Sequence, residues 1–128
     1  MKRLKAKYTA FMHYHFKRYR LRKICEALDI VPYPWQRDFA LGKADKIPGI
    51  IAYRGNGKTT AVMLRLLMLR PGEVHDILGT LRKDPDFTNE EMCRLRIYAD
   101  EYNSLAGKCR NAGIPVNQMA LHRFYKVI

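Results

Sequence analysis

The 128-residue sequence predicts one mainly α-helical domain with a minimal β element, an α+β arrangement. Apolar residues recur at helical spacing through most of the chain, whereas only residues 50–53 form a convincing strand pattern. The chain contains no internal repeat, low-complexity tract or interdomain linker, so one domain is expected over residues 1–128. No apolar run approaches the roughly 20 residues of a membrane span.

The first element is a basic helical segment, residues 1–28, which contains no glycine or proline. Its apolar side chains lie on two different faces, with Leu4, Tyr8, Phe11, Met12 and His15 on one and Leu21, Ile24, Cys25 and Leu28 on the other. We therefore expect the helix to bend near residues 17–20 or to pack against two surfaces. Arginines interleaved with aromatic residues can grip phosphates and stack on bases, but we expect the aromatic residues of this segment to lie in the core.

Net charge is the strongest bulk signal, because 24 Lys and Arg residues against 12 Asp and Glu residues give +12 and a pI near 9.9. Such an excess on a small domain predicts a polyanionic partner, most often nucleic acid or a nucleoprotein complex. An acidic protein surface and a role in solubility remain alternatives. The basic residues that precede the first acid are the expected contacts: Lys2, Arg3, Lys5, Lys7, Lys17, Arg18, Arg20, Arg22 and Lys23.

The remaining elements follow from proline, glycine and apolar spacing. Prolines precede a short helix over residues 35–41, which Gly42 ends. A helix over residues 58–70 is apolar nearly all round, with Arg65 as the exception, and must be covered on several sides. A weaker helix is expected over residues 73–81. The most regular helix begins at a capping box, Thr88 with Glu91, and ends near Gly113. In the tail, residues 114–128, we expect a short helix over residues 117–123 and a final strand.

Residues 50–64, IIAYRGNGKTTAVML, place an apolar strand, a glycine-containing loop, a lysine with two threonines and an apolar helix in sequence. This is the order of a phosphate-binding loop, in which backbone N–H groups converge on phosphate oxygens at a helix N-terminus. Lys58 would reach the β and γ phosphates and Thr59 would hold Mg²⁺. The full motif has a glycine where this chain has Ala52.

This form of the motif, A-x-x-G-x-G-K-T, resembles the Walker A loop of superfamily 2 helicases, and RGNGKT resembles that of phage terminase large subunits. Upstream, PYPWQ is similar to the glutamine segment of those ATPases at about the same spacing. The resemblance covers residues 31–70 and implies ATP with Mg²⁺ as the cofactor. The implied nucleotide-binding residues are Gln36, which would read adenine, Arg54, Gly55, Asn56, Gly57, Lys58, Thr59 and Thr60.

Two features set this chain apart from those ATPases. Their second acidic motif, which positions Mg²⁺ and water, has no convincing counterpart, because Asp100-Glu101 lies within the regular helix, where we expect it to face solvent. A single strand also leaves backbone groups unpaired unless a partner completes the sheet or the loop simply caps a helix. We therefore expect an incomplete P-loop-like unit flanked by helices, with no catalytic residues.

Three functions remain open at this stage. The first is a small phage-type accessory or counter-defence protein, an inhibitor for example, that binds nucleic acid or a nucleic-acid-handling complex without catalysis. The alternative is an ATP-binding, truncated relative of a terminase or helicase ATPase. The third is a structural module. Cys25, Cys93, Cys109 and the four histidines show no metal or disulfide spacing, so we predict no metal site, and we expect the protein in the cytoplasm of a bacterial host.

Overall fold

The computed structural model describes residues 2–43, 57–70, 73 and 89–117. Within these ranges the chain is helical and contains no strand, which confirms the mainly α prediction. The helices are α1 (Lys2–His15), α2 (Lys17–Leu28), α3 (Pro34–Ala40), α4 (Lys58–Met68) and α6 (Asn89–Asn111). The expected strand at 50–53, the helix at 73–81 and the elements of the tail beyond residue 117 lie outside the described residues.

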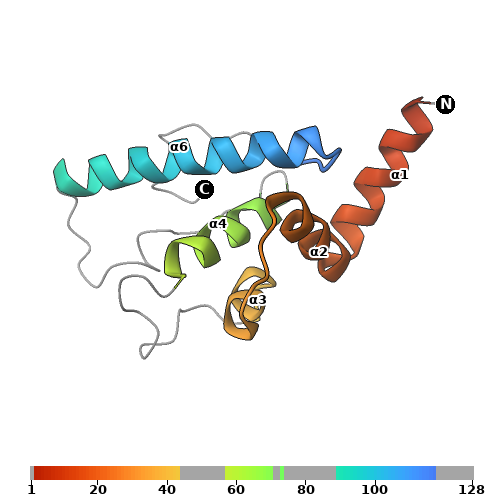
Figure 1. The fold of residues 1–128 in the computed structure, drawn as a ribbon. Helices are drawn as coiled ribbons and strands as arrows, with labels where there is room; N and C mark the ends of the chain where they lie inside the picture. The colour runs from red at the N-terminus through yellow and green to blue at the C-terminus, as the bar shows by residue number, and fades with distance from the viewer. Residues whose placement is uncertain (1, 44–56, 71–72, 74–88, 118–128) are drawn as a thin grey trace.

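The basic helical segment breaks at Phe16, immediately before the expected bend. Phe16 has an extended backbone (φ −118°, ψ 90°), although its N–H still donates to Met12 O at 3.1 Å. The break allows α2 to change direction relative to α1 (Figure 1). As a result Leu21 and Ile24 enter the core, whereas the apolar face of α1 does not.

Helix α4 occupies the centre of the molecule, with α6 above it, α3 below it and α2 beside its C-terminal end (Figure 1). Its side chains are buried nearly all round, as its sequence predicts. The buried α4 residues are Ala61, Val62, Met63, Leu64, Leu66, Leu67 and Met68. Arg65 is half-buried; its Nη1 donates to Phe39 O at 3.1 Å, and its guanidinium lies over the Phe39 ring.

Helix α6 covers one side of α4 with an amphipathic face. Tyr102, Ala106 and Cys109 are buried at the spacing that the sequence predicts, whereas Asp100 and Glu101 are exposed to solvent. Gly113 ends the helix with φ +81°, and the N–H of Ile114 donates to Cys109 O at 2.9 Å. Both the helix and its stop were therefore predictable. None of the helices in the described part of the chain is long and apolar enough to cross a membrane.

Candidate functional site

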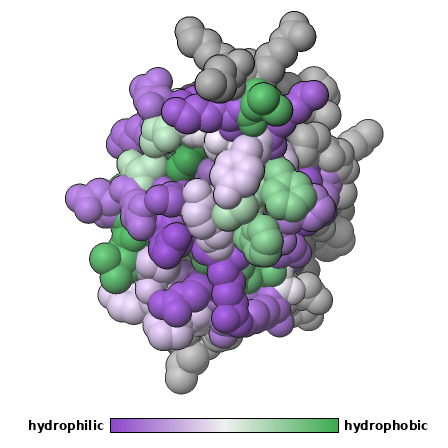
Figure 2. Space-filling model, turned by 90° about the vertical axis from the view of Figure 1, so that its right-hand side faces the viewer, coloured by the Kyte–Doolittle hydropathy of each residue, from purple (hydrophilic) through white to green (hydrophobic). Residues whose placement is uncertain are grey.

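A cationic surface covers α1 and α2. It consists of five exposed side chains and one half-buried side chain: Lys5, Lys7, Lys17, Arg18, Arg22 and Lys23. Figure 2 looks at the side of the molecule on which these two helices lie and shows hydrophilic side chains around apolar ones. Helix α1 contains no acidic residue, so the potential near its described side chains is set by cations. The side chains of Lys2 and Arg3 lie outside the described set.

Glu26 is the one acidic residue of α2. Its carboxylate lies 4.0 Å from Arg22 Nε and 3.6 Å from Lys23 Nζ; the Arg22 and Glu26 side chains are well exposed, and that of Lys23 is partly exposed. Exposed ion pairs of this kind contribute little to stability and exchange readily. Lys5, Lys7, Lys17 and Arg18 precede Glu26 and carry the excess positive charge of the cationic surface.

Three aromatic residues of the basic helical segment differ from the expectation that they lie in the core, whereas Tyr14 and Tyr19 are half-buried. Tyr8 is 65% exposed, and Phe11 and Phe16 are each 50% exposed. Helix α1 projects away from the other helices, so that no described helix packs against its N-terminal half (Figure 1). These rings form an aromatic cluster, which consists of Tyr8, Phe11, His15 and Phe16.

Arg20 also differs from the expectation, because it is a core residue and does not belong to the cationic surface. Its side chain is 1% exposed, Nη2 donates to Leu67 O at 2.6 Å, and the guanidinium lies 5.0 Å from the centre of the Tyr14 ring. Nε and Nη1 are buried without a hydrogen-bond partner. Burial lowers the pKa of Arg20. Its one hydrogen bond satisfies a carbonyl at the C-terminal end of α4, where positive charge is favourable.

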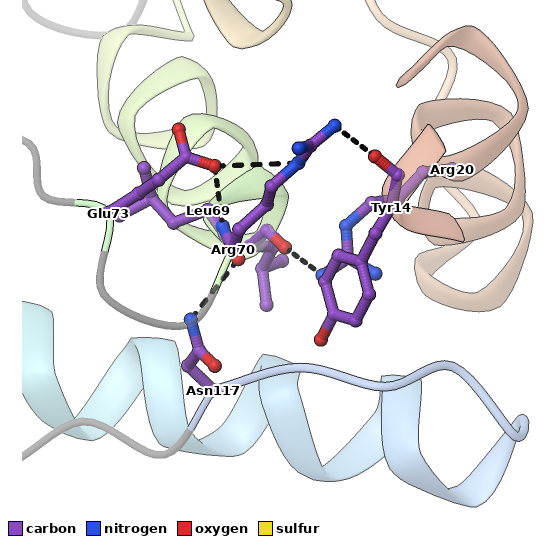
Figure 3. A network of polar contacts seen from close by, with 7 residues as sticks. Tyr14, Arg20, Leu69, Arg70, Glu73 and Asn117 are labelled. Atoms are coloured by element: carbon purple, nitrogen blue, oxygen red, sulfur yellow. Dashed lines mark hydrogen bonds and ion pairs between the residues drawn. The ribbon is translucent and has the colours of Figure 1, made fainter. Parts of the chain in front are cut away.

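A second arginine joins α1 to the end of α4 (Figure 3). Arg70 Nη2 donates to Tyr14 O, and Arg70 Nε lies 3.7 Å from Glu73 Oε1. The backbone N–H of Arg70 donates to the same carboxylate oxygen at 3.1 Å. The last turn of α1 is therefore hydrogen-bonded through its backbone to the residue that follows the C-cap of α4.

The segment after α6 closes the same end of α4. Asn117 Nδ2 donates to Leu69 O at 3.2 Å, and Figure 3 shows this amide reaching toward α4 from the segment beside α6. The Tyr102 hydroxyl donates to Asn117 O at 2.7 Å, and burial raises the pKa of Tyr102. Side chains thus donate to three backbone carbonyls near this end of α4. Arg20 donates to Leu67 O, Asn117 donates to Leu69 O, and Tyr102 donates to Asn117 O.

His13 lies on the packed side of α1, whereas His15, two residues later, is exposed. The His13 ring is buried 5.3 Å from the centre of the Tyr19 ring, and its Nδ1 has no hydrogen-bond partner. Burial lowers the pKa of His13, and the charges of Arg20 and Lys23 lower it further. The buried imidazole is therefore neutral in the folded protein near pH 7.

We expect the stability of the protein to fall as the pH is lowered below about 6.5, the pKa of His13 in the unfolded chain. Below pH 6.5 His13 takes up a proton in the unfolded chain but stays neutral in the folded protein. The stability that the neutral, buried His13 contributes is therefore complete above pH 6.5 and is lost as the pH falls toward the lower pKa of the folded state. Urea denaturation at pH 7.5 and 5.5 measures it. His13→Leu should reduce the pH dependence; an unchanged slope in this variant would contradict the assignment.

The structure brings together the two segments on which the ATPase resemblance depends. Gln36 is buried on α3; its Oε1 accepts a hydrogen bond from the Tyr33 N–H at 2.9 Å, and its Nε2 donates to Gly57 O at 2.9 Å. Gly57 has φ +81°, and a Cβ at this position would overlap Gln36 Nε2. In this structure the Gln36 amide therefore joins the start of α3 to the start of α4.

The other residues of the predicted nucleotide site are described only in part. Lys58, Thr59 and Thr60 form the first turn of α4 and are half-buried. Arg54, Gly55 and Asn56 lie outside the described residues, so the loop that would cradle a phosphate is not seen. The nucleotide-binding role of this set stays a prediction.

The cysteines that the structure describes are buried core residues. Cys25 and Cys109 are free thiols, and burial raises the pKa of both. The side chain of Cys93 is outside the described set. Within the described part of the chain, no group of three or more metal-ligating side chains gathers at one place.

The aromatic cluster is the part of this surface that sequence reasoning placed in the core. The helical wheel identifies its face correctly, but nothing in the local pattern tells an exposed aromatic face from a buried one. Comparisons with protein-family models, with curated proteins and with solved structures found no match.

Proposed function

We propose that this protein binds nucleic acid, alone or within a nucleoprotein complex, through the cationic surface of α1 and α2, without catalysis. The observation that carries the proposal is the concentration of exposed Lys and Arg side chains on one helix pair, α1 and α2, whose junction is hydrogen-bonded to the C-terminal end of α4 through Arg20 and Arg70. Such a surface attracts phosphates and releases their counterions on binding. A small phage-type accessory or counter-defence protein is the biological setting that we propose.

The nucleotide-binding alternative receives less support. The resemblance to terminase and helicase ATPases depends on a glutamine whose amide is bonded to Tyr33 and Gly57 within the chain. The first turn of α4 supplies Lys58 and Thr59, as that resemblance requires, but the phosphate-binding loop before it lies outside the described residues. The proposal that the cationic surface binds nucleic acid, in contrast, depends only on side chains that the structure describes.

The test is a variant in which Lys5, Lys7, Lys17 and Arg18 are all replaced by glutamine. We expect its affinity for nucleic acid to fall, and the slope of log K against log salt to decrease by about one for each phosphate that the variant no longer neutralises. Fluorescence anisotropy with labelled DNA and RNA over a range of salt concentrations measures both. All four residues are exposed, so the fold should be retained.

The matched control removes the same number of charges elsewhere: Arg37, Lys43, Arg96 and Lys108 are replaced by glutamine. These side chains lie on other elements and reach solvent, so this variant has the same net charge as the first. We expect it to bind nearly as well as the natural sequence. Equal losses of affinity in the two variants would mean that the net charge of the whole protein, and not this surface, attracts the polyanion. An affinity that does not change with salt concentration would contradict the proposal.

A further inference from the structure

The aromatic cluster is arranged as an exposed surface of rings at the junction of α1 and α2. The ring centroids of Phe11 and His15 are 4.3 Å apart at an interplanar angle of 32°, and those of Phe11 and Phe16 are 6.3 Å apart at 75°. Tyr8 lies one turn before Phe11 on the same face of α1 and is more exposed than either phenylalanine. The cluster therefore presents aromatic area that no described part of the chain covers.

The described charged residues next to the cluster in the sequence are all cationic. Lys5 and Lys7 lie beside Tyr8 on α1, Lys17 and Arg18 follow Phe16 on α2, and all four are exposed. A second copy of this chain would bring two cationic surfaces together and would be repelled. A strand of nucleic acid, in contrast, supplies phosphates to the cations and flat bases to the rings.

We propose that the aromatic cluster stacks on unpaired bases, so that the nucleic acid bound at the cationic surface is single-stranded. This inference rests on the proposed function and names its substrate class. In a duplex the bases already stack on each other, and their faces are closed to side chains that approach from outside. In a single strand the faces are open, and each ring that stacks on a base raises affinity with little regard to sequence.

The experiment compares a labelled oligodeoxythymidine with a duplex of the same length in anisotropy titrations. We expect the single strand to bind more tightly. Replacing Phe11 and Phe16 together by leucine should weaken single-strand binding by about tenfold or more, because a stacked base contributes about 1–3 kcal/mol. Leucine keeps the apolar character but removes the flat ring. The salt slope should stay unchanged, since every cation that neutralises a phosphate is still present.

Two further variants make the result specific. Tyr33→Leu removes an aromatic side chain that is 63% exposed but lies outside the cluster, before α3, and it should bind like the natural sequence. Phe11→Trp should keep the affinity, and its added fluorescence should be quenched when the oligonucleotide stacks on it. Circular dichroism of each variant confirms that it is folded.

The outcomes separate this inference from the proposed function. If the leucine variant binds the single strand normally while the glutamine variant of the cationic surface does not, the stacking inference fails and the proposed function stands. Equal affinity for duplex and single strand also overturns the inference. If neither nucleic acid binds, both proposals fail. A change of oligomeric mass in the leucine variant, or retained binding to anionic vesicles without oligonucleotide binding, would assign the cluster to another partner and overturn it.

Discussion

Replacing Arg20 with alanine is expected to lower the free energy of unfolding by about 3–5 kcal/mol. Arg20 is among the largest fully buried side chains, and its truncation leaves a cavity between α1, α2 and the end of α4. It also leaves Leu67 O, now bonded at 2.6 Å, without its donor. Urea denaturation followed by circular dichroism measures the loss.

Arg20→Met is the control that separates volume from charge. Methionine nearly fills the same space, and although it also loses the hydrogen bond to Leu67 O, it removes Nε and Nη1, two buried donors without partners. An unsatisfied buried donor costs about 1–3 kcal/mol, comparable to the hydrogen bond that methionine cannot make. We therefore expect Arg20→Met to lie within about 1 kcal/mol of the natural sequence. A loss as large as that of the alanine variant would show that the guanidinium contributes more than its packing.

Gly57→Ala is expected to destabilise the protein by about 3–4 kcal/mol. The positive φ of Gly57, +81°, costs a residue with a Cβ about 1–2 kcal/mol. The new methyl group would also displace the Gln36 amide, which is buried and bonded on both sides, at about 1 kcal/mol for each hydrogen bond. Thermal and urea denaturation measure the total.

Gly42→Ala is the matched control for the steric part. Gly42 has a nearly identical φ, +78°, but a Cβ there would have nothing within 4 Å, so only the backbone cost of about 1–2 kcal/mol is expected. In a Gln36→Ala background, Gly57→Ala should cost no more than Gly42→Ala, because the amide that it displaces is gone. If Gly57→Ala and Gly42→Ala cost the same in the natural background, the contact between Gln36 and Gly57 does not hold the two helices together.

Local signals predicted much of the described fold. Gly42 and Gly113 end the helices before them, the apolar circumference of residues 58–68 places α4 in the centre, and Asp100 and Glu101 face solvent within the regular repeat of α6. The break between α1 and α2 followed from two apolar faces that no straight helix could bury together. All of these depend on residues within a few turns of each other.

The candidate site was predicted less well, and two reversals explain why. The sequence pattern placed the aromatic residues of α1 in the core and Arg20 on the surface; in the structure Phe11 and Tyr8 are exposed and Arg20 is buried. A charge-based rule assigns an arginine to solvent because burial costs desolvation. It cannot include the carbonyl of Leu67, which lies 47 residues away in the sequence and stabilises the buried guanidinium.

The order of residues along the chain was enough to set where helices begin and end, which of their faces are apolar and where positive charge concentrates, since these depend on backbone preference and spacing along one element. Packing between helices then decided which apolar face was covered and which arginine entered the core. It also brought the Gln36 amide into hydrogen-bond contact with Gly57 O. The difference arises because burial is a property of pairs of surfaces. A helix face stays in water unless another element of the chain arrives at the right place to cover it, and in this chain none of the described helices reaches the outer half of α1.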